Sequence, residues 1–476
     1  MKTELENLFR EYTGRMPDRI VQLTSSGSHR TYFRLYSGTD SYIGVAGTMA
    51  EENETFCSLS AHFLSKGINV PEIYAVSRDG MCYLQEDLGH ESLYDRLLPG
   101  RQSGKYSAED AELLERTIGK LPQIQVEGAE GWDFSGCFHS QSFNPRSIMF
   151  DLNYFKYCFL LTSGVEFNEE KLQDDFLILA SELMKDMDDT FMYRDFQSRN
   201  VMLKDGEPYF IDFQGGRKGP VYYDVASFVW QARSDFPKDL KERLVGAYIR
   251  ALGKYRRVDE DMFRSRLRIF VFFRTLQVLG AYGFRGGYER KRHFLESIPY
   301  AISNLKESVP AVSGICPYLA EICSAMTEMP RFAKPQAVSG NPAALKVRIF
   351  SFSYRKGIPE DTSGNGGGYV FDCRGMHNPG KYERFRTLTG MDREVADFLE
   401  SRGEAASFLS NVFSLADAHV RKYIERGFTD LMFSFGCTGG QHRSVYCAEA
   451  LASHLKAGYD ITIELFHREQ GVKKIL

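Results

Sequence analysis

Alternating apolar and polar positions predict a β-rich segment at residues 19–90. The runs RTYFRLYS, SYIGVAGT and MCYLQEDLG alternate, or are rich in β-branched and aromatic residues, as strands are. One stretch with helical periodicity, residues 54–67, interrupts them and ends at Gly67, a residue suited to a helix C-terminus. We therefore expect a first lobe, residues 1–90, built from strands and one helix.

Helical periodicity dominates the next part of the chain, and we expect a mostly helical lobe over residues 91–330. The clearest helical stretches are residues 172–186, 238–252 and 262–282. A short strand pair, 201–203 and 208–212, lies among them and is joined by the turn Lys204-Asp205-Gly206.

A linker separates these lobes from the last part of the chain. The segment MPRFAKPQAVSGNPAAL has three prolines and no hydrophobic periodicity, and we assign residues 331–345 to the linker itself. Residues 346–476 alternate between strand and helix patterns, which favours a separate α/β domain with helices packed on a sheet. Strands are expected at 346–353, 369–374, 430–435 and 460–466, and helices at 394–401, 405–426 and 445–456.

Composition and charge narrow the class of protein. The 476 residues are 43% hydrophobic and 26% charged with a net charge of −4, so neither disorder nor non-specific nucleic-acid binding is expected of the whole chain. The 9 cysteines form no C-x-x-C pair, which argues against a disulfide framework or a zinc site. The N-terminus is polar, and the most apolar stretch, residues 269–279, is too short to span a bilayer. We expect a cytoplasmic protein without membrane contact.

One constellation of acidic and amide residues predicts phosphoryl transfer. Asp195 is followed five residues later by Asn200, and the strand pair after Asn200 ends in Ile211-Asp212-Phe213. Transfer from ATP needs one carboxylate to orient the acceptor hydroxyl and further oxygen ligands to hold magnesium. Each residue alone could be a turn or cap residue, which Asp and Asn commonly are. The three together, at this spacing, favour a kinase site.

The run YRDFQSRNVML…PYFIDFQGGRKGPVYYDVASFVWQAR resembles the aminoglycoside phosphotransferase-like kinases. Within them it looks closest to the N-acetylmuramate/N-acetylglucosamine anomeric kinases, and the upstream runs SHRTYFRL, NVPEIYA and YLQEDLG agree. The resemblance covers about residues 5–330. It implies an α+β, bilobal, protein-kinase-like fold with ATP and Mg²⁺ as cofactors.

The resemblance also implies roles for single residues. Asp195 would be the catalytic base, Asn200 and Asp212 would bind magnesium, and Asp224 would brace the catalytic loop as a buried carboxylate. The residues expected to contact ATP are Gly27, Ser28 and Arg30 in a turn over the phosphates, and Gln85, Glu86 and Leu88 in a hinge beside adenine.

Because of two departures from the family pattern, a pseudokinase without catalytic activity remains an alternative. The histidine usual before Arg-Asp is replaced by Tyr193, and the strand lysine that usually neutralises phosphate charge is missing from residues 42–47. Arg30 is the candidate substitute, and a solvated surface arginine is the alternative reading.

A second constellation, GCTGGQHRS at residues 436–444, predicts an anion site in the last domain. A glycine-rich turn from a strand into a helix presents backbone N–H groups at the positive helix end, and Arg443 adds a bidentate donor. Cys437 and Arg443 also have the C-x₅-R-S spacing of cysteine-dependent phosphatases, in which a thiolate attacks phosphorus. A tight turn without a ligand is the plain alternative.

The blocks FSYRKGIP, YVFDCRG, HNP, LTGMD, VADFL and GCTGGQHRSVYCAEALASHL resemble the C-terminal domain of the RNase adapter protein RapZ. That resemblance implies binding of an amino-sugar metabolite and, in some bacteria, of a small RNA. Residues 365–368 are expected to form a mobile loop. The residues expected around the anion are Asp372, Arg374, His377, Cys437, Thr438, Gly439, Gly440, His442, Arg443 and Ser444.

The main hypothesis is an ATP- and Mg²⁺-dependent kinase for an N-acetylated hexosamine in amino-sugar and cell-wall recycling. The acceptor would be N-acetylglucosamine or N-acetylmuramate, with the anomeric hydroxyl favoured. An amino-sugar phosphate or nucleotide sugar would be the effector of the last domain. The alternative is a non-catalytic adapter, a pseudokinase joined to a metabolite- or RNA-binding domain, although the small basic excess of that domain supports RNA weakly. The third hypothesis is a bifunctional kinase with a phosphatase-like loop.

Overall fold

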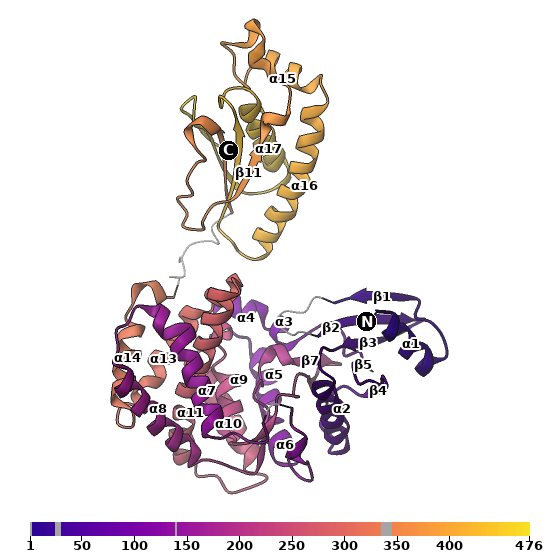
Figure 1. The fold of residues 1–476 in the computed structure, drawn as a ribbon, viewed down its shortest axis with the longest axis vertical. Helices are drawn as coiled ribbons and strands as arrows, with labels where there is room; N and C mark the ends of the chain where they lie inside the picture. The colour runs from indigo at the N-terminus through magenta and orange to yellow at the C-terminus, as the bar shows by residue number, and fades with distance from the viewer. Residues whose placement is uncertain (1, 24–29, 139, 335–344) are drawn as a thin grey trace. The chain divides into compact units, whose positions relative to one another are not determined.

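The computed structural model describes residues 2–23, 30–138, 140–334 and 345–476. The chain divides into two compact units, Met1–Pro335 and Gln336–Leu476 (Figure 1). Each unit has its own hydrophobic core, and each is described by itself below.

The first unit begins with an antiparallel sheet of five strands in the order β1-β2-β3-β5-β4. Helix α1 (Lys2–Thr13) covers one face, where Leu5, Leu8 and Phe9 pack against Phe33 and Leu35. The opposite face, which carries Ile43 and Val45, shares a core with helix α2 (Ala50–Ser65). The strands are β1 (Arg19–Gln22), β2 (Thr31–Ser37), β3 (Asp40–Ala46), β4 (Ile73–Val76) and β5 (Cys82–Glu86).

Helix α2 begins four residues earlier than the sequence pattern predicts, at Ala50 instead of residue 54. Its N-cap residue, Met49, makes no side-chain capping bond, so the usual sequence signal for a helix start is missing. The earlier start matters because it places Glu52 within the helix.

The rest of the first unit is a helical lobe, as predicted, and the expected helices at 172–186, 238–252 and 262–282 are present. The helices of this lobe are α3 (Leu93–Arg96), α4 (Leu98–Ser103), α5 (Ala108–Gly119), α6 (Leu121–Val126), α7 (Pro145–Phe155), α8 (Glu169–Met184), α9 (Tyr222–Val229), α10 (Lys238–Leu252), α11 (Glu260–Tyr282), α12 (Arg292–Leu295), α13 (Ile298–Ser308) and α14 (Pro317–Thr327).

Helix α11 is the central helix of this lobe. With the π-helical turn that follows, it forms a 29-residue segment, Glu260–Tyr288, that is long and apolar enough to cross a membrane by length and composition alone. However, 61% of its most apolar window is buried inside the unit, and Phe270, Phe272 and Phe273 are fully buried. The segment is therefore the core helix of a globular lobe.

Two small ladders position the loops between these helices. Strand β6 (Thr190–Met192) pairs with β9 (Arg217–Gly219), and β7 (Val201–Lys204) pairs with β8 (Glu207–Phe210). The predicted hairpin is present, with positive φ at Asp205 and Gly206 in its turn. Its second strand ends at Phe210, earlier than expected, because Asp212 adopts φ 68°, which a strand cannot accommodate.

The second unit is a five-stranded sheet in the order β11-β12-β10-β13-β14, parallel except for β14. Helices α15 (Arg393–Glu400), α16 (Glu404–Glu425) and α17 (Arg443–Gly458) share one core with the sheet. Strand β11 ends at Asp372, two residues before the predicted end, and the edge strand β14 was not predicted. The strands are β10 (Lys346–Ser353), β11 (Tyr369–Asp372), β12 (Asp430–Cys437), β13 (Thr462–His467) and β14 (Val472–Ile475).

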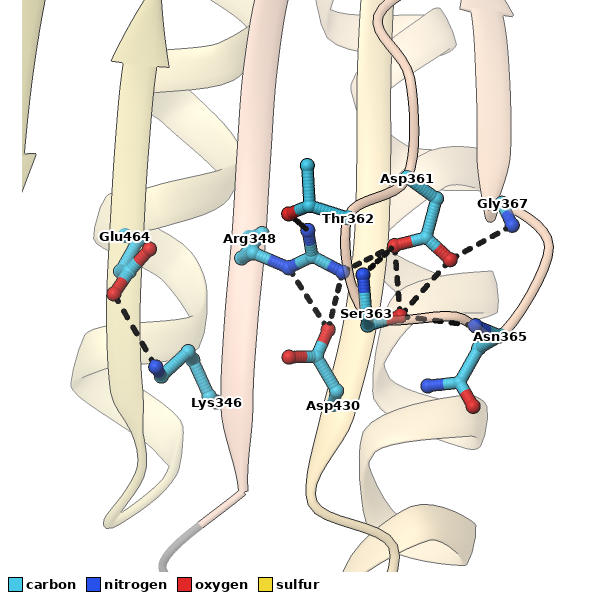
Figure 2. A network of polar contacts seen from close by, with 9 residues as sticks. All are labelled: Lys346, Arg348, Asp361, Thr362, Ser363, Asn365, Gly367, Asp430 and Glu464. Atoms are coloured by element: carbon cyan, nitrogen blue, oxygen red, sulfur yellow. Dashed lines mark hydrogen bonds and ion pairs between the residues drawn. The ribbon is translucent and has the colours of Figure 1, made fainter. Parts of the chain in front are cut away.

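A polar network holds the connection between β10 and β11 (Figure 2). The buried Arg348 donates from Nε to Asp430 at 2.9 Å and also forms an ion pair with Asp361. Asp361 in turn accepts a 2.9 Å hydrogen bond from the backbone N–H of Gly367. The loop 365–368, which we expected to be mobile, is thus tied to the sheet because one buried arginine fixes the carboxylate that caps it.

Candidate functional site

A buried carboxylate fixes the catalytic loop of the first unit. Asp224 lies in the first turn of α9 and is fully buried. It accepts hydrogen bonds from the backbone N–H groups of Tyr193 at 2.7 Å and Arg194 at 2.8 Å, and a longer one from Gln125 at 3.3 Å. These bonds hold Arg194 at φ 76°, so that the chain turns sharply at the residue before Asp195.

The three residues of the predicted kinase constellation lie together. The Asn200 amide donates from Nδ2 to the backbone carbonyl of Asp195 at 2.9 Å and to Asp212 Oδ2 at 3.4 Å. The Asp195 side chain is 57% exposed, whereas Asp212 is less exposed. One carboxylate is therefore open to an acceptor, while the second faces an amide group.

The electrostatics of Asp212 suit a cation. Burial, and then the negative charge of Asp195, raise the pKa of Asp212 above its ordinary value, against the opposing hydrogen bond from Gln214. Mg²⁺ is bound in proteins by carboxylate and amide oxygens, and a cation would relieve the repulsion between two nearby carboxylates. No group of three or more His, Cys, Asp or Glu residues suited to a metal occurs in the described ranges, so phosphate oxygens would have to complete such a site.

Tyr193, which replaces the usual histidine, links the two loops of the site. Its ring is buried, and its hydroxyl donates to the backbone carbonyl of Ile211 at 2.5 Å. Burial raises the pKa of Tyr193 well above the ordinary tyrosine value, so it stays a neutral donor. This role of Tyr193 could not be inferred from the sequence, which shows only that a tyrosine stands where the family pattern has histidine.

On the side expected to hold ATP, the predicted residues are only partly described. Gly27 and Ser28 lie outside the described residues. Arg30 is 3% exposed and pairs with Glu52 of α2, with 2.6 Å between Nη2 and Oε1, so it is not the solvated surface arginine of the alternative reading.

The expected hinge spans the last two residues of β5 and the residues just after it. Gln85 and Leu88 are buried there, and Glu86 forms an ion pair with Lys204 of β7, which joins the sheet to the helical lobe.

Three arginines, Arg194, Arg274 and Arg217, lie near the buried carboxylate of Asp151. Arg194 Nη2 lies 3.5 Å from Asp151 of α7, and Arg274 Nη2 of α11 lies 3.8 Å from Asp195. Arg217 is 2% exposed, and burial, followed by repulsion from Arg194, lowers its pKa to about 10. Within the described part of the chain, the Nε atoms of Arg217 and Arg274 are buried without a hydrogen-bond partner. Such a cluster is a receptor for negative charge.

In the second unit, the loop 438–442 joins the carboxyl end of β12 to the first residue of α17, as the sequence predicts. Cys437 is 3% exposed, and its sulfur lies 3.1 Å from Ser444 Oγ and accepts a 3.2 Å hydrogen bond from the Gly440 N–H. Thr438 and Gly439, by contrast, are exposed at the tip of the loop.

Arg443 and His442 both contact backbone carbonyls beside this loop. Arg443 Nη1 donates to the backbone carbonyls of Arg374 at 2.9 Å and Met376 at 2.8 Å, and His442 Nε2 lies 2.8 Å from the carbonyl oxygen of Phe385. Both side chains are buried. The coil carbonyls beside the loop use Nη1 of Arg443, whereas its Nε is buried without a hydrogen-bond partner among the described residues. Whether Arg443 donates to an anion stays a prediction.

The neighbouring loop brings the other predicted residues near. Asp372 pairs in register with Gly436, one residue before Cys437, and forms an ion pair of 2.7 Å with Arg374. Arg374 is half exposed and lies 4.2 Å over the ring of Tyr354. His377 lies 3.1 Å from the Tyr382 hydroxyl.

Comparison with family models decides the class of the first unit. Residues 19–261, more than half of the chain, match the model described as "Phosphotransferase enzyme family". The chain belongs to this family. The predicted protein-kinase-like fold and the predicted phosphotransferase class, acting on a hydroxyl acceptor, are thereby confirmed.

The second unit of this phosphotransferase family member matches the model "RapZ C-terminal domain" over residues 345–471, which confirms the second resemblance. A "Nucleotide-binding protein" from Alkalilimnicola ehrlichii is 37% identical over 134 residues, which are 28% of this chain and 44% of the relative. Another from Bacillus cytotoxicus is 36% identical over 131 residues, which are 28% of this chain and 42% of the relative. The chain spans less than half the length of these two curated relatives.

Solved structures related to this phosphotransferase family member are distant in sequence. A choline kinase from Cryptosporidium parvum is 11% identical, covers 69% of this chain and 99% of its own, and has a TM-score of 0.47. The choline kinase LicA from Streptococcus pneumoniae is 12% identical, covers 66% and 99%, and has a TM-score of 0.43. Neither likeness identifies the acceptor of this family member.

Proposed function

We propose that the protein is an ATP- and Mg²⁺-dependent kinase that phosphorylates a hydroxyl of an N-acetylated hexosamine. The observation that carries the proposal is the convergence of Asp195, Asn200 and Asp212 on one side of a loop braced by Asp224. The complete set favours a kinase over the non-catalytic adapter, because a pseudokinase has no chemical need for all three residues. A cytoplasmic location follows from the need for ATP.

Each residue of the set has a separate role. The exposed Asp195 carboxylate accepts a hydrogen bond from the acceptor hydroxyl, orients it and takes its proton as the oxygen bonds to the γ-phosphorus of ATP. The bond between that phosphorus and the bridging oxygen breaks, and ADP leaves. Asn200 and Asp212 would hold Mg²⁺ through their side-chain oxygens. The metal, when bound, neutralises phosphate charge. Asp224 and Tyr193 hold the two loops so that these oxygens stay in place.

The arginine cluster favours an acidic acceptor. Arg274 brings a buried guanidinium beside Asp195, and the buried Arg217 lies near Asp151 in the same cluster. The Nε atoms of both arginines lack partners within the described residues. A carboxylate on the acceptor would satisfy those donors. Of the two sugars predicted from the sequence, N-acetylmuramate carries a carboxylate and N-acetylglucosamine does not. N-acetylmuramate is therefore the preferred acceptor, with its anomeric hydroxyl as the expected nucleophile.

The second unit is proposed to bind an amino-sugar phosphate or a nucleotide sugar as an effector. The exposed residues Thr438 and Gly439 and the half-exposed Arg374 would offer donors to a phosphate. The names of the two relatives, both called nucleotide-binding proteins, support a phosphorylated ligand. A phosphatase reaction is disfavoured because Cys437 is buried and Arg443 is bonded to backbone carbonyls. The small basic excess of the unit gives RNA weaker support than a metabolite.

The test is an ADP-release assay with ATP and Mg²⁺ against N-acetylmuramate, N-acetylglucosamine, N-acetylgalactosamine, glucosamine and glucose. We expect turnover on N-acetylmuramate, a weaker reaction with N-acetylglucosamine, and loss of both in Asp195→Ala. Phosphorus NMR of the product distinguishes an anomeric from a 6-phosphate. Turnover on aminoglycosides or choline but on no hexosamine would overturn the acceptor assignment. ATP binding without turnover on any acceptor would favour the adapter.

A further inference from the structure

The strand that carries the phosphate-binding lysine in related kinases has no cation on either face. Ile43 and Val45 of β3 belong to the core shared with α2, and a side chain at Gly44 would meet Leu35 and Leu5 on the other face. A cation for the ATP phosphates therefore has to come from another element.

Arg30 lies where such a cation is needed. It directly precedes β2, whose first residue, Thr31, pairs with Ala46 at the end of β3. Its guanidinium is buried between the sheet and α2, forms the ion pair with Glu52, and lies 5.7 Å over the ring of Phe56, one turn further along α2. An arginine that precedes β2 and is held by a helix glutamate reproduces the charge pair that other kinases form with a lysine of β3.

Gln214 connects this pair to the metal-binding side. The side chain is 8% exposed, and its Nε2 donates both to Glu52 Oε1 at 3.3 Å and to Asp212 Oδ1 at 2.8 Å. One amide nitrogen thus joins a carboxylate of the sheet lobe to a carboxylate of the helical lobe. If α2 moved away from the loop that carries Asp212, the amide could satisfy only one of the two.

We propose that Arg30 binds the ATP phosphates in place of the missing strand lysine, and that Gln214 is a positioning residue that locks Glu52, the partner of Arg30, to Asp212. The relay Arg30–Glu52–Gln214–Asp212 assembles the phosphate cation and the metal ligand as one unit. This inference rests on the proposed kinase function but not on the identity of the acceptor.

The test measures nucleotide binding to the full chain by calorimetry, with adenosine and ATP as ligands and Mg²⁺ as the variable. In Arg30→Met we expect the affinity for Mg²⁺-ATP to fall about tenfold or more, the effect of losing one charge-assisted hydrogen bond, while adenosine affinity is unchanged. Arg30→Lys should restore part of the loss. Arg19→Met, which removes an exposed arginine stacked on Tyr36 in the same lobe, is the matched control and should bind like the wild type.

The variant Gln214→Leu tests the positioning role. It removes both donated hydrogen bonds, so the Mg²⁺ concentration that half-saturates ATP binding should rise several-fold, while adenosine affinity stays unchanged. Equal losses of ATP and adenosine affinity in Arg30→Met, or an unchanged Mg²⁺ requirement in Gln214→Leu, would overturn the relay and leave the kinase intact. A wild-type protein that bound no Mg²⁺-ATP would overturn the proposed kinase function together with the relay.

Discussion

The Tyr193 hydroxyl donates a 2.5 Å hydrogen bond to the backbone carbonyl of Ile211. Ile211 immediately precedes Asp212, and Tyr193 lies two residues before Asp195. The bond therefore joins the backbone that presents the proposed base to the backbone that presents the proposed metal ligand. A tyrosine in a position where the family pattern has histidine is compatible with an active kinase.

Removing only the Tyr193 hydroxyl tests this link. The variant Tyr193→Phe keeps the buried ring but loses one hydrogen bond, so we expect the free energy of unfolding to fall by about 1 kcal/mol. The Mg²⁺ concentration needed for half-maximal activity should rise, because Asp212 loses one of its supports. Urea unfolding and a Mg²⁺ titration of the rate measure the two effects. An unchanged Mg²⁺ requirement would show that the hydroxyl contributes stability alone.

Asp224 should make the stability of the first unit depend on pH. Burial raises the pKa of Asp224 to about 7, against the opposing hydrogen bonds from Tyr193, Arg194 and Gln125, whereas an unfolded aspartate has a pKa of about 3.9. The folded state then binds more protons between these values, so this group stabilises the fold below pH 4 and the contribution is lost as the pH rises through 7. We expect the difference in unfolding free energy between wild type and Asp224→Asn to shrink from pH 4 to pH 7. A difference that is constant over this range would contradict the assignment.

Arg274 should determine acceptor affinity. In Arg274→Gln, the cluster loses the guanidinium closest to Asp195, so KM for N-acetylmuramate should rise about tenfold while KM for ATP stays unchanged. The exposed Arg268 on the same helix provides the matched control, and Arg268→Gln should behave as the wild type. Steady-state kinetics with each substrate varied in turn decide the matter. A rise in KM for ATP instead would place Arg274 at the transferred phosphoryl group.

Two adjacent glycines in the second unit make a matched pair. At Gly440, φ is 67° and an added Cβ would lie 2.8 Å from the backbone nitrogen of Ser353, whereas at Gly439 nothing lies within 4 Å. We expect Gly440→Ala to destabilise the second unit by about 1–3 kcal/mol and Gly439→Ala to be nearly neutral. Thermal unfolding followed by calorimetry measures both variants, and equal effects of the two would contradict this reading of the loop.

The sequence predicts those parts of the site that are close together in the chain. Asp195, Asn200 and Asp212 lie within one loop and one hairpin, where spacing alone implies proximity. Glu52, Asp151 and Arg274 come from three separate helices, and no local spacing rule connects them to Asp195. Their proximity to the site follows only from the tertiary fold, which packs these helices together.

Predictions from local sequence patterns also missed one side-chain contact, one edge strand and one helix start. The turn from β12 into α17 was predicted correctly from its glycines, and its binding of an anion stays a prediction. The sequence could not reveal that Arg443 donates two hydrogen bonds to backbone carbonyls. The edge strand β14 has the sequence VKKI, which is too short and too charged to stand out as a strand. The start of α2 was missed because its N-cap makes no side-chain bond.

The backbone of Asp212 has a consequence for the evolution of this protein. Its φ of 68° suits glycine better than aspartate, and its carboxylate sits beside Asp195, which repels it. Replacing Asp212 by glycine should relieve both unfavourable terms, so the variant should unfold at a higher temperature than the wild type and transfer no phosphate. Selection for heat resistance alone would therefore favour an inert protein, and only selection for catalysis keeps an aspartate at this position.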